Sequence, residues 1–109
     1  RQMCIRDSEN TVAIELLRRG KNLFYWKSPQ GYEVDFVLLH STKVKQLIQV
    51  AYDIEDEKTR KREEKSLIKA SKELSCKNLL ILTWDEEKEV KINGKKIIYK
   101  PVWKLLLFE

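Results

Sequence analysis

The feature that most constrains the fold is a continuous apolar run, residues 78–83, that follows a long segment with helical periodicity. A short run in which polar residues do not alternate with apolar ones is typical of a strand covered on both faces. In residues 55–74 the apolar side chains share one helical face, whereas the lysines lie largely away from it. A helix that joins strands 44–52 and 78–83 forms a crossover, so these two strands are predicted to be parallel neighbours.

The remaining segments predict an antiparallel meander, a hairpin and two terminal helices. Three β-rich runs with short links form the meander, and Asn93-Gly94 is a strong type I′ turn signal for the hairpin. Gly20 ends the first helix, and Pro101 is predicted to open the last one. The predicted order is therefore α-β-β-β-α-β-β-β-α, a mixed central sheet flanked by helices in one α/β domain. The predicted elements span residues 9–19, 22–26, 32–40, 44–52, 55–74, 78–83, 89–92 and 96–99, with a short helix from 101.

Length and composition exclude several classes of protein. A chain of 109 residues is about one domain. No apolar run approaches the ~20 residues of a membrane-spanning helix, and no secretory signal is recognisable. The two cysteines, Cys4 and Cys76, show no disulfide or metal-ligand spacing, so we expect a cytoplasmic protein without a membrane partner. The net charge of +5 is compatible with nucleic-acid binding, and the oligomeric state stays open.

The first seven residues, Arg-Gln-Met-Cys-Ile-Arg-Asp, fit nothing downstream. They resemble the translation of a transposon-end sequencing adaptor, and the alternative is an ordinary disordered tail. We therefore treat residues 1–8 as a non-native or disordered tail and residues 9–109 as the domain. On the adaptor interpretation the native sequence begins near Ser8 or Glu9, and the upstream protein is missing.

Three polar residues occupy positions where burial is costly. Asp35 lies inside the second predicted strand, Gln49 lies inside the third, and Glu9 opens the first helix in the middle of its apolar stripe. Period-two geometry places Gln49 and Ala51 on one face of their strand, so Asp35 and Gln49 can be neighbours in the meander. A carboxylate in such a place must be paired, hydrogen-bonded or bound to metal.

This arrangement resembles the PD-(D/E)XK nuclease superfamily, which has a restriction-endonuclease-like core. The resemblance implies two strand acids that hold a divalent metal ion, often with a helix glutamate, and a lysine that orients or deprotonates the attacking water. Position by position, Glu9 matches the helix acid, Asp35 the strand acid, Gln49 the variable acid and Ala51 the lysine. Glu15, at the edge of the same helical stripe, is an alternative helix acid, although exposure or pairing with a nearby arginine is the simpler interpretation.

A closer resemblance is to the nuclease-like C-terminal domain, of unknown function, that follows the ATPase module in a large prokaryotic AAA-type family. It covers essentially residues 9–108 and implies an upstream ATPase domain as a partner in the same protein. This chain itself has no Gly-rich phosphate loop. The segments that carry the resemblance are 9–20, 24–26, 33–37, 48–52, 62–63 and 101–107.

Two departures from the nuclease pattern lead us to expect a non-catalytic domain. Gln49 is neutral and offers at most a weak amide ligand to a hard cation, and Ala51 has no group that transfers a proton or binds phosphate. We therefore expect an accessory domain for recognition of a partner or nucleic acid, or for regulation. Asp35 and Glu9 are then either a vestigial Mg²⁺ or Mn²⁺ site or a salt bridge or helix cap in a retained scaffold.

Two other functions remain open at this stage. A metal-dependent DNA endonuclease needs a lysine that has migrated to the long helix, where Lys61, Lys65 and Lys69 are available. A purely structural or oligomerising domain needs no site at all. Lys58, Lys61 and Lys65 are also the candidates for contacting nucleic-acid phosphates, against the alternative of a solvated helix face.

Overall fold

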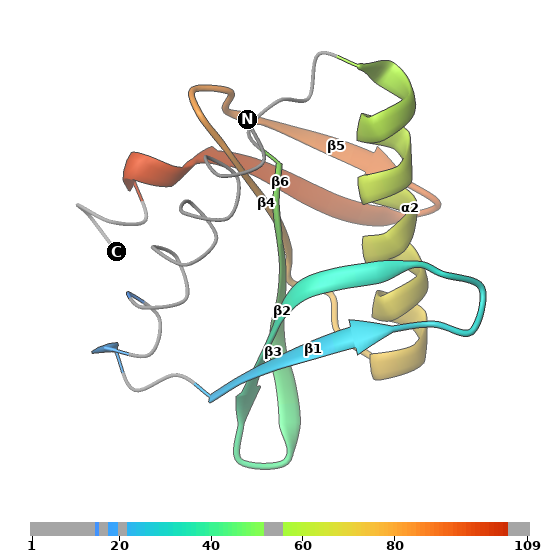
Figure 1. The fold of residues 1–109 in the computed structure, drawn as a ribbon, viewed down its shortest axis with the longest axis vertical. Coiled ribbons are helices and arrows are strands. Elements are labelled where there is room, and N and C mark those ends of the chain that lie inside the picture. Colours follow the sequence, from blue (N-terminus) through green and yellow to red (C-terminus); the bar gives the residue numbers. More distant parts are fainter. Residues whose placement is uncertain (1–14, 16–17, 20–21, 52–55, 105–109) are drawn as a thin grey trace.

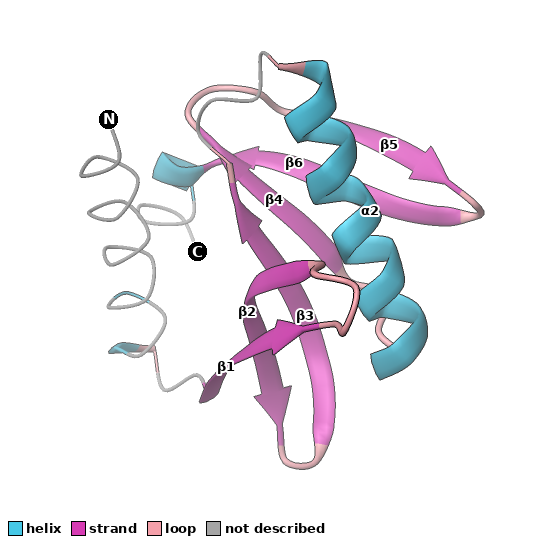
Figure 2. Ribbon diagram, turned by 45° about the vertical axis from the view of Figure 1, so that its right-hand side comes forward, coloured by secondary structure: helices cyan, strands magenta, loops and turns pink. Residues whose placement is uncertain are grey.

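The computed structural model describes residues 15, 18–19, 22–51 and 56–104. It shows a mixed α/β domain in which one six-stranded sheet has the strand order β1-β2-β3-β4-β6-β5. One long helix, α2, packs against a face of this sheet, as Figures 1 and 2 show. The elements are β1 (Asn22–Lys27), β2 (Glu33–His40), β3 (Lys43–Val50), α2 (Glu57–Leu74), β4 (Leu79–Thr83), β5 (Lys88–Ile92) and β6 (Lys95–Pro101).

The sheet combines an antiparallel meander with a parallel centre. β1, β2 and β3 pair antiparallel in chain order, as predicted. The chain then crosses through α2, and β4 pairs parallel with β3, which confirms the predicted crossover. All five residues of β4 are buried, because β4 lies between two neighbours at the centre of the sheet and both of its faces are covered.

The hairpin at the other edge also forms as predicted. β5 and β6 pair antiparallel around Asn93 and Gly94, whose φ angles are +52° and +77°. Positive φ at both central positions is what a type I′ turn requires, and asparagine and glycine adopt it with the least strain.

Two apolar clusters lie on opposite faces of the sheet. Alternation along β4 separates them, because Leu79 and Ile81 belong to the cluster under α2 whereas Leu80 and Leu82 belong to the other. The α2 cluster also contains Tyr99 of β6, whose side chain is fully buried. Gln49 is only 1% exposed at the same level of the sheet, so its side-chain amide needs hydrogen-bond partners inside the protein.

The ends of α2 explain its boundaries. Asp56 is the N-cap, and its carboxylate accepts hydrogen bonds from the Lys58 amide (3.1 Å) and the Thr59 hydroxyl (3.0 Å). The helix stops at Ser75, which has a left-handed backbone conformation with φ of +55°. This conformation lets the Ser75 amide bond back to Ser71 and turns the chain into β4.

The terminal helices of the prediction lie largely outside the described residues. Glu15 and Arg18 are helical, and the Arg19 amide donates to the Glu15 carbonyl (3.1 Å). Pro101 does not open the last helix as predicted. It pairs with Thr83 as the final residue of β6, and the helix begins one residue later. Within the described part of the chain, no helix is both long and apolar enough to span a membrane.

Candidate functional site

Asp35 and Gln49, the two polar strand residues singled out from the sequence, are neighbours in the structure. The backbone register between β2 and β3 runs up to the pair Phe36 and Ile48, and side chains bridge the strands beyond it. The Gln49 amide donates through Nε2 to the Glu33 carbonyl (2.7 Å) and accepts through Oε1 from the Asp35 amide (2.9 Å). In return, Oδ2 of Asp35 accepts from the Val50 amide (2.8 Å). We call the residue pair Asp35 and Gln49 the β2–β3 clamp.

The clamp lies where the backbone register between β2 and β3 ends, next to an irregularity in the pairing of β2 with β1. β2 carries a register shift opposite β1 between the Phe24 and Trp26 pairs, which leaves Asp35 and Phe36 opposite Tyr25 alone. Such an extra residue bends a strand and interrupts its ladder. The clamp side chains supply the hydrogen bonds that the ladder no longer makes. A primary amide suits this position because it offers a donor and an acceptor together, which a carboxylate does not.

Ala51, which the nuclease resemblance aligns with the lysine, is partly buried. Its side chain packs against the cluster beneath α2, and its amide donates to the Leu82 carbonyl of β4 (2.9 Å). It therefore continues the link between β3 and β4 just past the end of β3. The methyl group carries out no acid–base chemistry, so the clamp itself consists of one carboxylate and one amide.

Tyr25 adds a phenol beside the clamp that sequence reasoning missed. A hydrogen bond with the Glu33 carboxylate raises the pKa of Tyr25 to about 12, and burial and the charges of Glu33 and Asp35 act in the same direction. The ring is 58% exposed. The neighbourhood of Asp35 is therefore negative, which favours a cation over a phosphate at this edge.

The described clamp residues do not form a divalent-metal site by themselves. In the described part of the chain, no group of three or more Asp, Glu, His or Cys side chains is placed to hold an ion. Oδ2 of Asp35 and Oε1 of Gln49 already accept backbone hydrogen bonds. Glu9, the other predicted ligand, lies outside the described residues, so a metal site formed by Asp35 and Glu9 stays a prediction.

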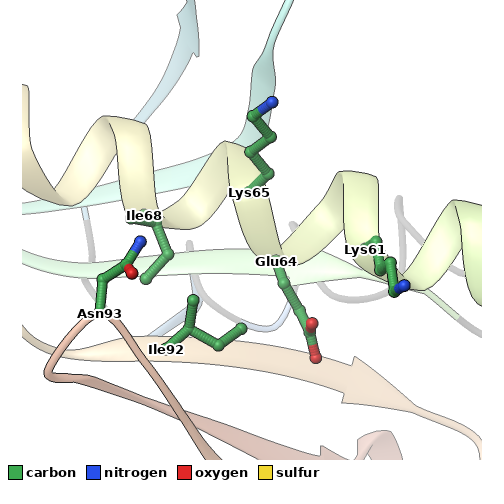
Figure 3. A pocket seen from close by; sticks show the side chains of 6 residues that line it. All are labelled: Lys61, Glu64, Lys65, Ile68, Ile92 and Asn93. Carbon is green, nitrogen blue, oxygen red and sulfur yellow. The ribbon is translucent and has the colours of Figure 1, made fainter.

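A second polar cluster lies between the N-terminal half of α2 and β6. Glu64, which is only 9% exposed, accepts a hydrogen bond from the hydroxyl of the fully buried Tyr99. Burial and this carboxylate both raise the pKa of Tyr99. Figure 3 shows Glu64 pointing from α2 towards the hairpin strands, where Ile92 and Asn93 face the helix. A pocket of about 360 Å³ opens here, lined by Lys61, Glu64, Lys65, Ile68, Ile92 and Asn93.

An ion-pair network extends this second cluster. Both terminal nitrogens of the Arg60 guanidinium contact Glu86, at 3.1 and 3.3 Å, and Lys88 lies 2.8 Å from the same carboxylate. Burial acts to raise the pKa of Glu86, but the hydrogen bond from Lys88 and the charge of Arg60 prevail and lower it. Arg60 and Lys88 also lie over the Tyr99 ring, 5.6 and 4.9 Å from its centroid. The network joins α2 to the β5 edge of the sheet.

The predicted phosphate-contacting lysines have different neighbours along α2. Lys61 and Lys65 both line the Glu64 pocket, and the amine of Lys65 also lies 5.4 Å from the ring centroid of Tyr32, just before β2. Lys69 joins it there, 5.0 Å from the same ring. A hydrogen bond with Lys65 lowers the pKa of Tyr32, and the charges of Lys65, Lys69 and Arg62 act in the same direction against the effect of burial. Sequence reasoning missed Tyr32 because it lies 33 residues from Lys65 in the chain.

The fold and the clamp define the class of protein. It is an α/β domain with a mixed sheet, in which side chain–backbone hydrogen bonds join β2 to β3 at one end. The family follows from the sequence. Residues 8–105 match the model described as "Domain of unknown function (DUF4143)", and because this is most of the chain, the chain belongs to that family. No curated protein and no solved structure was found to match it.

Proposed function

We propose that this chain is a non-catalytic, nuclease-fold accessory domain of an AAA-type ATPase that serves partner or nucleic-acid recognition, or regulation. The observation that carries the proposal is the clamp. The nuclease resemblance aligns Asp35 and Gln49 with metal-binding positions, and here both make hydrogen bonds that join β2 to β3. The acid position is thus used to stabilise the sheet.

The chemistry of the remaining groups supports the same proposal. Hydrolysis of a phosphodiester at such a site needs a metal-activated water and a cation that offsets the phosphate charge. Gln49 is neutral, and Ala51 supplies only a methyl group to the packed interior. A single change of role, from catalysis to structure, would account for both departures from the nuclease pattern, the neutral Gln49 and the methyl group of Ala51.

The alternative of a migrated lysine requires an amine close to the Asp35 carboxylate. Lys65 and Lys69 lie over the Tyr32 ring, and Lys61 lines the pocket beside Glu64. Each of these lysines therefore has surroundings of its own that explain its position. Mg²⁺ or Mn²⁺ is a cofactor only under this alternative.

The nuclease part of the proposal is tested with the full chain and labelled linear and branched DNA, in buffer with Mg²⁺, Mn²⁺ or no metal. We expect no metal-dependent cleavage. Asp35→Asn is the matched control, because asparagine keeps an oxygen that accepts the Val50 amide hydrogen bond but removes the carboxylate charge. Cleavage by the chain that Asp35→Asn abolishes would overturn the proposal.

The ATPase part is tested by the complete gene. We expect a Gly-rich phosphate-binding loop to be encoded upstream of the residues that begin near Glu9. A complete gene that lacks such a loop would contradict the assignment to an ATPase, whatever the cleavage assay shows.

A further inference from the structure

One side of α2 carries an uninterrupted row of cations. The row consists of Lys58, Arg62, Lys65, Lys69 and Lys72, and we call it the basic stripe. The spacing of four, three, four and three residues keeps all five side chains on one face of a helix, and all five residues are exposed. At about 1.5 Å of rise per residue, the stripe extends over about 21 Å.

The basic stripe is unfavourable for the isolated domain. Like charges three or four residues apart repel one another on a helix surface. Contacts with the segment just before β2 hold part of the stripe in place, because Lys65 and Lys69 lie over the Tyr32 ring and Arg62 donates to the Gly31 carbonyl (3.4 Å). The protein thus concentrates and orients positive charge along one line, which is what a regularly spaced polyanion would neutralise.

A groove adjoins the C-terminal half of the stripe. It has a volume of about 460 Å³ and lies between α2 and the turn that joins β1 to β2. Trp26 contributes a partly exposed indole, whose Nε1 donates to the Glu73 carboxylate, and Gln30 contributes an exposed amide. The residues that line it are Trp26, Ser28, Gln30, Lys69, Lys72 and Glu73.

We propose that the basic stripe and this groove bind a single strand of nucleic acid, with successive phosphates along α2 and one base in the groove beside Trp26. This rests on the proposed recognition function and names its partner. An aromatic wall next to cations is how sequence-tolerant single-strand binding is built, because every base has a face that stacks. A paired and stacked base in a duplex does not present that face. An acidic peptide matches the charge but leaves the aromatic groove unexplained.

The test uses the full chain and a fluorescent oligothymidine of about 20 nucleotides, with binding followed by anisotropy. If four cations of the stripe contact phosphates, the logarithm of the affinity falls with the logarithm of salt concentration with a slope of about −3. This corresponds to roughly 50-fold weaker binding at 200 mM than at 50 mM salt. A duplex of the same length should bind more weakly than the single strand.

The decisive variant is Lys69→Glu with Lys72→Glu, which reverses the two stripe charges that line the groove. Its matched control is Lys43→Glu with Lys45→Glu, two exposed lysines on β3 that change the net charge equally. We expect the stripe variant to bind roughly 10-fold more weakly or worse at low salt, and the control to stay within about 2-fold of the parent. Circular dichroism verifies that the stripe variant is folded, because it removes the contact of Lys69 with the Tyr32 ring and places a negative charge in the last turn of α2.

Several outcomes would overturn the inference. They are undetectable binding at low salt, equal loss of affinity in both double variants, a duplex that binds as tightly as the single strand, and equal competition by polyglutamate of matched length. The last would point to an acidic polypeptide as the partner. Metal-dependent cleavage of the oligonucleotide would overturn the non-catalytic proposal but leave the stripe intact, so the two failures are distinguishable.

Discussion

Replacing Gln49 with glutamate places a second carboxylate in the β2–β3 clamp and should destabilise this protein. The introduced group has no hydrogen to donate to the Glu33 carbonyl, so the 2.7 Å hydrogen bond is lost. That loss costs about 1 kcal/mol. The site is 1% exposed and adjoins the Asp35 carboxylate, so burial and like-charge repulsion add roughly 1–3 kcal/mol. We expect the free energy of unfolding to fall by about 2–4 kcal/mol at pH 7.

The sign of the pH dependence separates this explanation from general damage to the core. Burial and the nearby Asp35 charge raise the pKa of the introduced carboxyl in the folded state, so the folded state binds a proton more readily than the unfolded state does. The deficit is therefore largest at pH 7 and shrinks as pH falls towards the unfolded-state pKa of about 4.3. The protonated acid can also donate to the Glu33 carbonyl.

Urea denaturation of the parent and Gln49→Glu at several pH values measures this effect. Gln46→Glu is the matched control, because it makes the same chemical change on the same strand at a more exposed position. The control should change stability by no more than about 0.5 kcal/mol. Equal stability of Gln49→Glu and the parent at pH 7 would refute the structural role of the clamp, as would full recovery of the variant by Mg²⁺.

Three further substitutions test the packing around α2. Glu86→Gln should lower stability by about 1–2 kcal/mol at neutral pH by weakening the contact with Arg60. Because the folded-state pKa of Glu86 is lowered, its contribution is present above the unfolded-state pKa and is lost on acidification, so the deficit should vanish in acid unfolding series. Tyr99→Phe leaves the Glu64 carboxylate without its phenol donor and should cost about 1–3 kcal/mol in urea denaturation. Because the folded-state pKa of Tyr99 is raised, the parent loses stability as pH rises above the unfolded-state pKa of the phenol. The variant should not show this alkaline loss of stability. Ser75→Gly removes the strain of a left-handed backbone at the end of α2. It should raise the free energy of unfolding by about 0.5 kcal/mol and so raise the thermal midpoint. A lower midpoint would contradict this.

Local sequence signals predicted most of the described fold. The continuous apolar run of β4 and the helix before it predicted the parallel crossover, and Asn93-Gly94 predicted the hairpin. Each signal lies within one continuous segment of the chain, so it can be recognised in a single sequence without knowledge of the tertiary contacts. Pro101 was assigned to the wrong element, because its fixed φ suits a strand end as well as a helix start, and only the pairing with Thr83 decides between them.

The candidate site was predictable only in part. Period-two geometry and the meander brought Asp35 and Gln49 together, but the donor and acceptor roles of the Gln49 amide depend on where the β2–β3 register ends. The partnership of Glu64 with Tyr99 joins residues 35 positions apart and leaves no local pattern. Contacts that depend on tertiary packing are therefore the part that a pattern in one sequence does not carry.

Whether this domain cleaves DNA is measured most directly by comparing the parent chain with Asp35→Asn in a Mn²⁺-dependent DNA cleavage assay. The clamp geometry predicts that both proteins leave linear and branched DNA as intact as the metal-free control does. Metal-dependent cleavage by the parent, lost in a folded Asp35→Asn variant, would contradict the proposed structural role of Asp35 and Gln49.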